Sequence, residues 1–141
     1  MTNLTPNGVS AYAINAITGA ISLISGSSIA AGTMPYDVKV DPWGRFAYAA
    51  NYSSNNISAY TIDPSTGILT AVSGSLFAAG TGTYTVNIDP SGLFAYAVNY
   101  FTNNVSAYAI DQTTGALVPI SGAPYAAGTR PAFISTTAVI Q

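Results

Sequence analysis

The sequence predicts an all-β fold built from three copies of one small sheet. The segment SAYAI at residues 10–14 recurs as SAYTI at 58–62 and as SAYAI at 106–110, so the step is 48 residues, and no insertion or deletion disturbs it. Between regularly spaced Gly, Pro, Asn and Asp turn signals, β-branched and aromatic residues dominate. The Ala-rich pieces are interrupted by Gly and Thr, which leaves no helix of normal length.

The middle copy shows the elements of one unit in order. Its four predicted strands are separated by turn signals and lie at residues 36–40, 46–50, 57–62 and 68–72. Asp41 and Asp63 each stand before a Pro and open the turns after the first and third strands. An Asp at the first position of such a turn caps the backbone, so we expect a structural role for these carboxylates and for Asp89 and Asp111 at the same repeat positions.

A repeated four-stranded unit of roughly 40 to 50 residues is typical of a β-propeller blade. We therefore expect a single propeller domain over residues 1–141. Its parts are a partial N-terminal blade at 1–35, complete blades at 36–83 and 84–131, and an inner strand at 132–141 that completes a shared blade. The repeated Tyr and Phe residues recur in every blade, which favours packing between blades over a single site; they are Tyr12, Tyr60, Tyr108, Tyr48, Tyr96, Phe46 and Phe94.

Two segments carry a family resemblance. DPWGRFAYAANY at residues 41–52 and DPSGLFAYAVNY at 89–100 resemble the repeated segment of the YVTN-repeat and lactonase-like seven-bladed propellers, as do the NNxSAYxI and TGxL segments that follow each of them. The resemblance covers essentially the whole chain and implies the propeller fold. That family includes sugar-lactone hydrolases, surface-layer components and proteins of unassigned role, so the resemblance leaves the function open.

Composition excludes several classes of function. The chain has no Cys, His or Glu, which removes thiol nucleophiles, the Ser-His-Asp triad, ordinary zinc sites and disulfides. Its three cations, Lys39, Arg45 and Arg130, are too few to neutralise a run of phosphates, so no nucleic-acid partner is expected. Polar residues interrupt every apolar run before the roughly 18 residues that span a bilayer. We expect no cofactor, no metal and no membrane insertion.

The compartment is left open by the sequence. Residues 1–8 have neither the basic start nor the apolar stretch of a signal peptide. The low Lys content and the abundance of Ser, Thr, Asn and Gly favour an extracellular protein.

Three blades cannot surround an axis, because closed propellers carry about 4 to 8. We expect self-association that covers the two end sheets, with a six-bladed homodimer preferred over a trimer. The strand at 131–136 would then complete the blade begun by a partner's strands at 9–14 and 20–24. The alternative is that the chain is a natural or engineered fragment of a longer propeller.

Two groups of residues are candidates for a ligand site. The loops that share one end of the propeller provide a possible ligand face formed by Thr33, Tyr52, Asn55, Asn56, Thr81, Tyr100, Asn103, Asn104 and Arg130. Hydroxyl and amide groups exchange hydrogen bonds with sugars, and Tyr offers a flat apolar face. The first strands provide a possible channel lining of Asp37, Lys39, Thr85 and Asn87.

The sequence favours a non-enzymatic scaffold or self-assembling module. A binding module for a glycan or another polar small molecule is one alternative, and a sugar-lactone hydrolase is the other. Composition argues against the hydrolase, because lactone hydrolysis needs a general base and a group that stabilises the oxyanion, and most of the Asp residues open turns.

Overall fold

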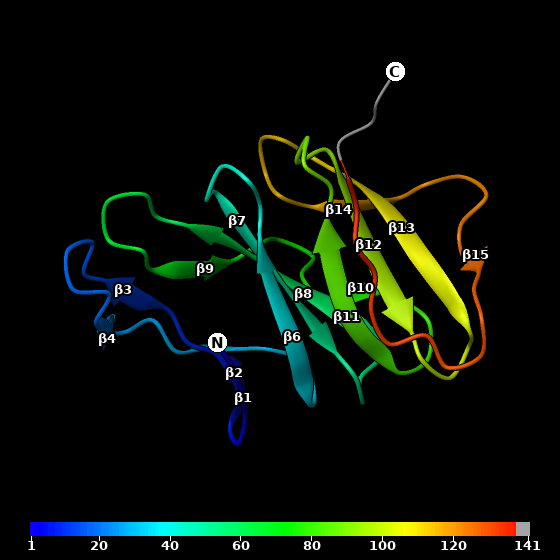
Figure 1. Cartoon of the computed structure of the whole chain (residues 1–141), viewed down its shortest axis with the longest axis horizontal. Coiled ribbons are helices and arrows are strands. Elements are labelled where there is room, and N and C mark those ends of the chain that lie inside the picture. Colours follow the sequence, from blue (N-terminus) through cyan, green and yellow to red (C-terminus); the bar gives the residue numbers. More distant parts are fainter. Residues whose placement is uncertain (138–141) are drawn as a thin grey trace.

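Strands alone make up the regular structure of residues 1–137. The computed structural model describes residues 1–137, and every regular element in that range is a β-strand (Figure 1). The predicted all-β class is confirmed. None of the described residues form a helix long and apolar enough to cross a membrane.

Two complete blades share one antiparallel order. Each begins with an inner strand, which pairs with a second strand, which pairs with a third, and the third pairs with two short outer strands. The second blade consists of β6 (Pro35–Val40), β7 (Phe46–Asn51), β8 (Asn56–Ile62), β9 (Leu69–Ala71) and β10 (Phe77–Ala78). The third blade consists of β11 (Thr83–Ile88), β12 (Phe94–Asn99), β13 (Asn104–Ile110), β14 (Leu117–Pro119) and β15 (Tyr125–Ala126).

The outer edge of each blade differs from the single fourth strand that we expected. β9 pairs with the end of β8, and β10 pairs with its beginning. Between them, Gly74 has φ 75° and Leu76 has φ 78°, a left-handed backbone that cannot continue a strand. Two short strands therefore share the edge that one longer strand was predicted to form.

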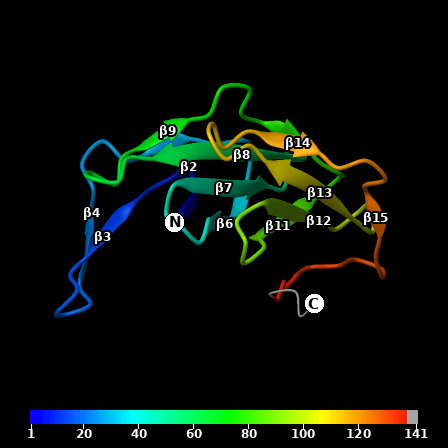
Figure 2. The same cartoon turned by 90° about the horizontal axis from the view of Figure 1, so that it is seen from above.

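The N-terminal strands form two small sheets. A three-stranded sheet is formed by β1 (Thr2–Leu4), β2 (Asn7–Val9) and β5 (Ile29–Ala30), and a separate hairpin by β3 (Tyr12–Ile14) and β4 (Ile21–Leu23). The expected strand at 9–14 is thus divided between β2 and β3. Figure 2 shows this hairpin at one end of the molecule and the third blade at the other.

The C-terminal segment follows the inner edge of the third blade. Asn87 Nδ2 donates to Thr136 Oγ1 at 2.7 Å, and Thr136 Oγ1 donates to the carbonyl of Ile88 at 3.3 Å, which ties residues 131–137 to β11. We expected an inner strand at 132–141, but residues 132–137 form no regular strand, and residues 138–141 lie outside the described residues.

Neighbouring blades bury their apolar faces against one another. Phe46, Tyr48 and Ile57 of the second blade belong to the same buried cluster as Val86 and Ile88 of the third. A second cluster joins the first blade to the second through Val9, Ala47, Tyr60 and Leu69. The predicted packing role of the repeated aromatic residues is confirmed for Tyr48, Tyr60 and Tyr108, all 2% exposed or less.

A buried asparagine ties the second strand of each complete blade to the third. Asn99 Nδ2 donates to Asn104 Oδ1 at 2.8 Å and to Ser106 Oγ at 2.9 Å, and Asn51 makes the same two bonds in the second blade. Both side chains are 0% exposed. These amides fix the register of the inter-strand loop.

Replacing Asn99 with Ala is expected to lower the free energy of unfolding by about 1–3 kcal/mol, because Asn104 and Ser106 lose a buried donor. Urea unfolding measures the change. The exposed outer-strand variant Thr70→Ala is the control and should shift stability by less than about 0.5 kcal/mol. Equal unfolding midpoints for Asn99→Ala and the unaltered chain would contradict this account.

Candidate functional site

The inner strands carry a bulge at the same place in both complete blades. The pairing of β6 with β7 shifts between Pro35 and Asp37, and that of β11 with β12 shifts between Thr83 and Thr85. Such a bulge re-aims side chains and occurs often next to active sites. Here the bulges place Tyr36 and Tyr84, with the residues that follow them, along the inner edge of the propeller.

Asp37 is the centre of a polar network on this edge. Its Oδ1 lies 3.2 Å from the ammonium of Lys39. Its Oδ2 accepts a short hydrogen bond from the hydroxyl of Thr85, and the backbone N–H of Val86 donates to the same oxygen at 3.4 Å. The third blade therefore holds a carboxylate that the second blade supplies, and one carboxylate oxygen faces a cation.

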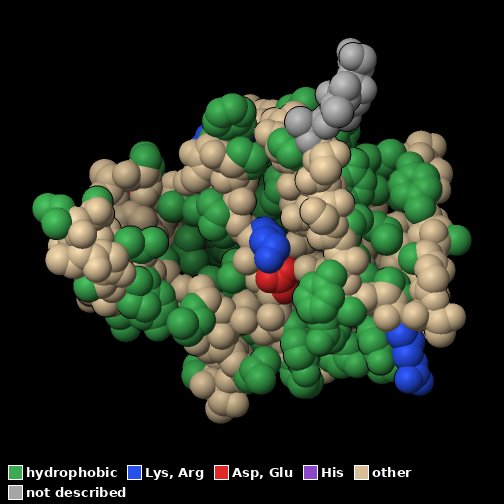
Figure 3. Space-filling model, in the orientation of Figure 1, with side chains coloured by type: hydrophobic (Ala, Val, Ile, Leu, Met, Phe, Trp, Pro, Cys, Tyr) green, Lys and Arg blue, Asp and Glu red, His purple; other side chains and the backbone are tan. Residues whose placement is uncertain are grey.

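A small cavity opens beside this network. It has a volume of about 210 Å³ and is lined by Tyr36, Asp37, Lys39, Tyr84, Thr85 and Phe133. The side chain of Asp37 is 23% exposed and that of Lys39 is 45% exposed, so both reach solvent. Figure 3 shows a basic group beside an acidic one at the middle of this face, with hydrophobic side chains next to them.

Six aromatic rings form a continuous surface next to the cavity. Tyr36 and Tyr84 stack with centroids 5.3 Å apart and planes at 25°, and Phe133 meets Tyr84 edge-on at 5.9 Å. We call the whole set the aromatic platform; its members are Tyr36, Tyr52, Tyr84, Tyr100, Phe101 and Phe133. It spans both complete blades and the C-terminal segment.

Three of the four predicted channel residues meet in this site. Asp37, Lys39 and Thr85 are in direct contact, whereas Asn87 bonds to Thr136 instead. The residues that sequence reasoning missed are Tyr36, Tyr84 and Phe133. The signal that points to the tyrosines is that they share one repeat position, directly before Asp37 and Thr85.

The asparagines of the predicted ligand face bond within the protein. Asn55 Oδ1 accepts from the N–H of Gly82 at 2.8 Å, and Asn103 Oδ1 accepts from the N–H of Arg130 at 2.7 Å, so each joins its loop to the next blade-linking loop. Asn56 and Asn104 accept the bonds from the buried asparagines described above. These four amides hold the loops in place.

The other residues of that face divide into two groups. Tyr52 and Tyr100 belong to the aromatic platform, and the guanidinium of Arg130 lies 5.8 Å from the centroid of Tyr100. Thr33 and Thr81 are exposed, and their carbonyls accept backbone bonds from Ser53 and Phe101. The predicted ligand face is therefore continuous with the inner-edge site through Tyr52 and Tyr100.

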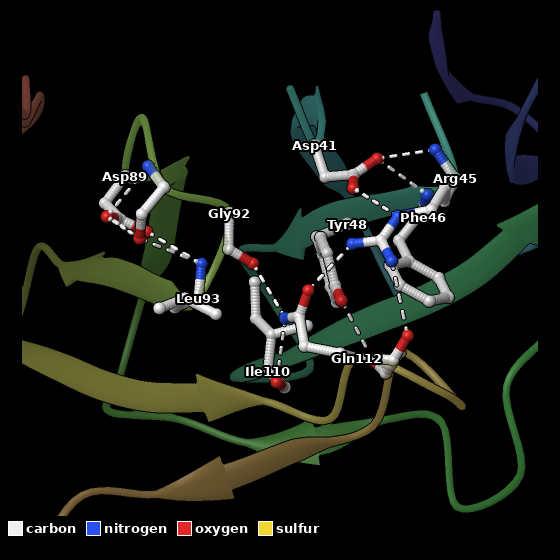
Figure 4. Close-up of polar contacts among 11 residues, drawn as sticks. Asp41, Arg45, Phe46, Tyr48, Asp89, Gly92, Leu93, Ile110 and Gln112 are labelled. Atoms are coloured by element: carbon white, nitrogen blue, oxygen red, sulfur yellow. Dashed lines mark hydrogen bonds and ion pairs between the residues drawn. The ribbon is translucent and has the colours of Figure 1, made fainter. Parts of the chain in front are cut away.

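The four turn aspartates cap their turns, as expected. Asp41 is 3% exposed and accepts from the N–H groups of Arg45 at 2.6 Å and Phe46 at 2.9 Å. The Arg45 guanidinium then donates to Gln112 Oε1 of the third blade at 2.8 Å (Figure 4). Burial, with the nearby Asp41 charge, raises the pKa of Tyr48, which keeps its hydroxyl a donor to the Gly115 carbonyl at 2.9 Å. This turn clamps two blades together.

Asp63 and Asp111 cap exposed turns. A hydrogen bond from the Ser65 hydroxyl, with others from the backbone of Ser65 and Thr66, lowers the pKa of Asp63 to about 2. Backbone bonds from Thr114 and Thr113 lower the pKa of Asp111. In the first blade Asn15 takes this position and accepts from Ile17 and Thr18 at 2.9 Å each. Asp37 is thus the one aspartate that caps no turn.

Residues 1–137 place no group of three or more His, Cys, Asp or Glu side chains where it could hold a metal ion. The side chains that line the cavity at the inner edge provide one carboxylate, one ammonium, hydroxyl groups and aromatic rings.

The chain belongs to a propeller family. Residues 1–84 and 37–132 match the family described as "Lactonase, 7-bladed beta-propeller", which confirms the resemblance to the lactonase-like propellers. A comparison with curated protein sequences gives no match.

Solved structures of similar fold include named lactonases. The putative 6-phosphogluconolactonase from Bacteroides fragilis NCTC 9343 is 24% identical with a TM-score of 0.72, over 84% of this chain and 33% of its own. The putative 6-phosphogluconolactonase from Bacteroides uniformis ATCC 8492 is 19% identical with a TM-score of 0.74, over 92% and 38%. The periplasmic gluconolactonase of Pseudomonas aeruginosa is 16% identical with a TM-score of 0.70, over 92% and 38%. The chain spans 33–38% of the length of these three proteins.

The expectation of a non-enzymatic scaffold is wrong. It is overturned by membership of the Lactonase family and by the lactonases among proteins of the same fold. The expectation rested on the absence of His and Glu and on aspartates that open turns, whereas Asp37 opens no turn and lies beside a cation and a cavity.

Acid is expected to destabilise the fold through the exposed turn aspartates. The folded pKa of Asp63, about 2, is below its ordinary value of 3.8, so its contribution is present above about pH 4 and is lost as the pH falls towards 2. Asp63→Asn should reduce the loss of stability over that interval, since Asn15 shows that an Asn holds the same turn. The converse variant, Asn15→Asp, should increase it. Thermal unfolding at pH 5, 4, 3 and 2 measures how steeply the melting temperature falls with pH in the unaltered chain and in each variant. The same pH dependence in all three proteins would refute the assignment.

Proposed function

We propose that the site at the inner edge, formed by Asp37, Lys39 and Thr85 beside the cavity, hydrolyses sugar lactones. Family membership and the fold shared with named gluconolactonases support this class of reaction. The observation that carries the proposal is the Asp37 carboxylate, which lies 3.2 Å from the Lys39 ammonium and faces a cavity. The chain spans only 33–38% of these structures, so the activity of a complete propeller ring is itself part of the proposal.

The two charged groups have complementary roles in the reaction. Asp37 accepts a proton from a water molecule while the water oxygen attacks the lactone carbonyl carbon. Lys39 stabilises the negative oxygen of the tetrahedral intermediate. The bond between that carbon and the ring oxygen then breaks, the proton passes to the released ring oxygen, and the product is the open-chain hydroxy acid.

The third blade positions the base. Thr85 and the N–H of Val86 bind Oδ2 of Asp37, which fixes the plane of the carboxylate. Such preorganisation matters because a misplaced base loses much of its effect. Thr85 is a positioning residue, since its hydroxyl is engaged by the carboxylate.

The aromatic platform suits a sugar ring. Its stacked members Tyr36 and Tyr84 line the cavity and offer apolar faces to C–H groups, and their hydroxyls offer hydrogen-bonding edges. The cavity of about 210 Å³ is below the roughly 300–1,000 Å³ of drug-sized sites, which favours a monosaccharide.

Asp37→Asn is expected to reduce the rate of glucono-1,5-lactone hydrolysis by about 100-fold or to the uncatalysed rate, because general-base catalysis contributes about 10²–10⁴-fold. Acid release in a pH-stat, corrected for spontaneous hydrolysis, is the measurement. Asp63→Asn, in a turn at the opposite end of the blade, is the matched control and should retain full activity. An Asp37→Asn protein as active as the unaltered chain would show that Asp37 is not the catalytic base.

An uncharged lactone is the expected substrate. Lys39 is paired with Asp37, so the charges that line the cavity cancel, and a phosphate group prefers cationic, bidentate partners. Steady-state kinetics should give a higher kcat/KM for glucono-1,5-lactone than for its 6-phosphate. The reverse order would show that the phosphate finds a cation elsewhere, with Arg130 then the residue to test.

A further inference from the structure

We propose that the substrate of the inner-edge site is a lactone that carries a second sugar. The inference rests on the lactone hydrolysis proposed above and names the class of substrate. The lactone ring occupies the cavity, whose volume of about 210 Å³ suits one sugar ring. The second sugar lies on the rings of the aromatic platform that are outside the cavity lining, those of Tyr52, Tyr100 and Phe101.

The outer rings of the platform continue the wall of the cavity. The ring centroid of Tyr52 lies 5.1 Å from that of Tyr36 and 5.9 Å from that of Tyr84, and both of these tyrosines line the cavity. The centroid of Phe101 lies 5.7 Å from that of Tyr52 and 5.1 Å from that of Tyr100. Figure 3 shows hydrophobic side chains that continue along this face from the acidic and basic pair. A sugar linked to the bound lactone therefore meets aromatic rings where it leaves the cavity.

The hydroxyl groups distinguish the platform tyrosines from the tyrosines that pack between blades. Tyr48, Tyr60 and Tyr108 each donate to a backbone carbonyl of a neighbouring blade. The platform tyrosines are Tyr36, Tyr52, Tyr84 and Tyr100. Within residues 1–137, no hydrogen bond uses the hydroxyl groups of these four side chains. A phenolic hydroxyl both donates and accepts, so the platform offers hydrogen bonds to sugar hydroxyls beside its apolar ring faces.

The side chain of Phe101 is not needed to shape its loop. Ser53 holds the same position in the second blade, and its N–H donates to the carbonyl of Thr33 at 3.1 Å. The N–H of Phe101 donates in the same way to the carbonyl of Thr81 at 3.0 Å. The loop therefore keeps its backbone bonds with either residue. Phe101 is 54% exposed, and a large exposed ring that the loop does not require indicates contact with a ligand.

A glycine beside the ring holds Phe101 in place. Gly82 has φ 71°, but Met34 and Arg130 adopt φ 53° at the same repeat position, so the backbone alone does not require glycine. A Cβ built on Gly82 would stand 2.8 Å from Cδ2 of Phe101 and 3.4 Å from Cε2 of Tyr52. A side chain at position 82 would therefore displace both rings. Gly82 and Phe101 occur together once in the chain, beside the blade that supplies Asp37.

The second sugar adds binding energy away from the reacting carbonyl. Water still attacks the lactone carbonyl carbon, the bond from that carbon to the ring oxygen still breaks, and the glycosidic bond stays intact. Contacts remote from the reacting atoms help to hold the carbonyl beside the base, so they raise kcat/KM. The product is the open-chain hydroxy acid with the second sugar attached.

The probes are cellobiono-1,5-lactone and glucono-1,5-lactone, which present the same lactone ring with and without a second sugar. Acid release in a pH-stat should give a kcat/KM about tenfold higher for cellobiono-1,5-lactone, because an aromatic contact contributes up to about one factor of ten. Phe101→Ser should remove most of this difference and leave glucono-1,5-lactone hydrolysis unchanged, since Ser53 shows that the loop accommodates Ser. Phe101→Trp should keep the difference.

Val118→Ser is the matched control, because Val118 is 56% exposed on the outer strand β14 and should affect neither lactone. Equal kcat/KM values for the two lactones in the unaltered chain would overturn the inference. A Phe101→Ser protein that keeps the full preference for cellobiono-1,5-lactone would overturn it as well.

Binding of unreactive lactams separates this inference from the proposed hydrolysis. In calorimetry, cellobiono-1,5-lactam should bind about tenfold more tightly than glucono-1,5-lactam, both to the unaltered chain and to Asp37→Asn. That preference without turnover of either lactone would support the site for the second sugar and overturn the hydrolysis alone. Equal binding of the two lactams would overturn the site for the second sugar, whatever the rate of glucono-1,5-lactone hydrolysis.

Discussion

Each blade depends on a neighbour, because a single sheet of this size cannot bury its own apolar face. The tyrosine of one blade donates to a carbonyl of the next, and the phenylalanine of one lies on a glycine of the next. The tyrosine contact repeats at the same spacing, from Tyr60 to Ala30 and from Tyr108 to Ala78, since the 48-residue period has no insertions. Packing between blades thus fixes the relative placement of the inner strands, and with it the site.

The site arises where the repeats differ. The scaffold residues are shared by all copies, but the inner-strand position of Asp37 is occupied by Thr85 and then by Phe133, and that of Lys39 by Asn87 and then by Ser135. One blade supplies the charges, the next supplies a hydroxyl, and the following segment supplies a ring. A repeated framework holds a cluster that is present once.

The sequence predicts the fold because the repeat and the turn residues agree on the three long strands of each complete blade. It also predicts Asp37, Lys39 and Thr85 as inner-edge neighbours, since one repeat aligns them. The bulges at Tyr36 and Tyr84 escape prediction because they depend on strand pairing, and the split outer edge escapes because Leu76 adopts a left-handed backbone that its type disfavours. The loop asparagines were expected at a ligand, but their bonds to the next loop become visible only in three dimensions.

The position of the second blade has a consequence for motion. The second blade has a neighbour on each side, and its polar clamp from Arg45 to Gln112 adds to the apolar contact. Asp37 and Lys39 therefore lie on a blade that is held from both sides, so we expect their geometry to persist when the short outer strands open locally.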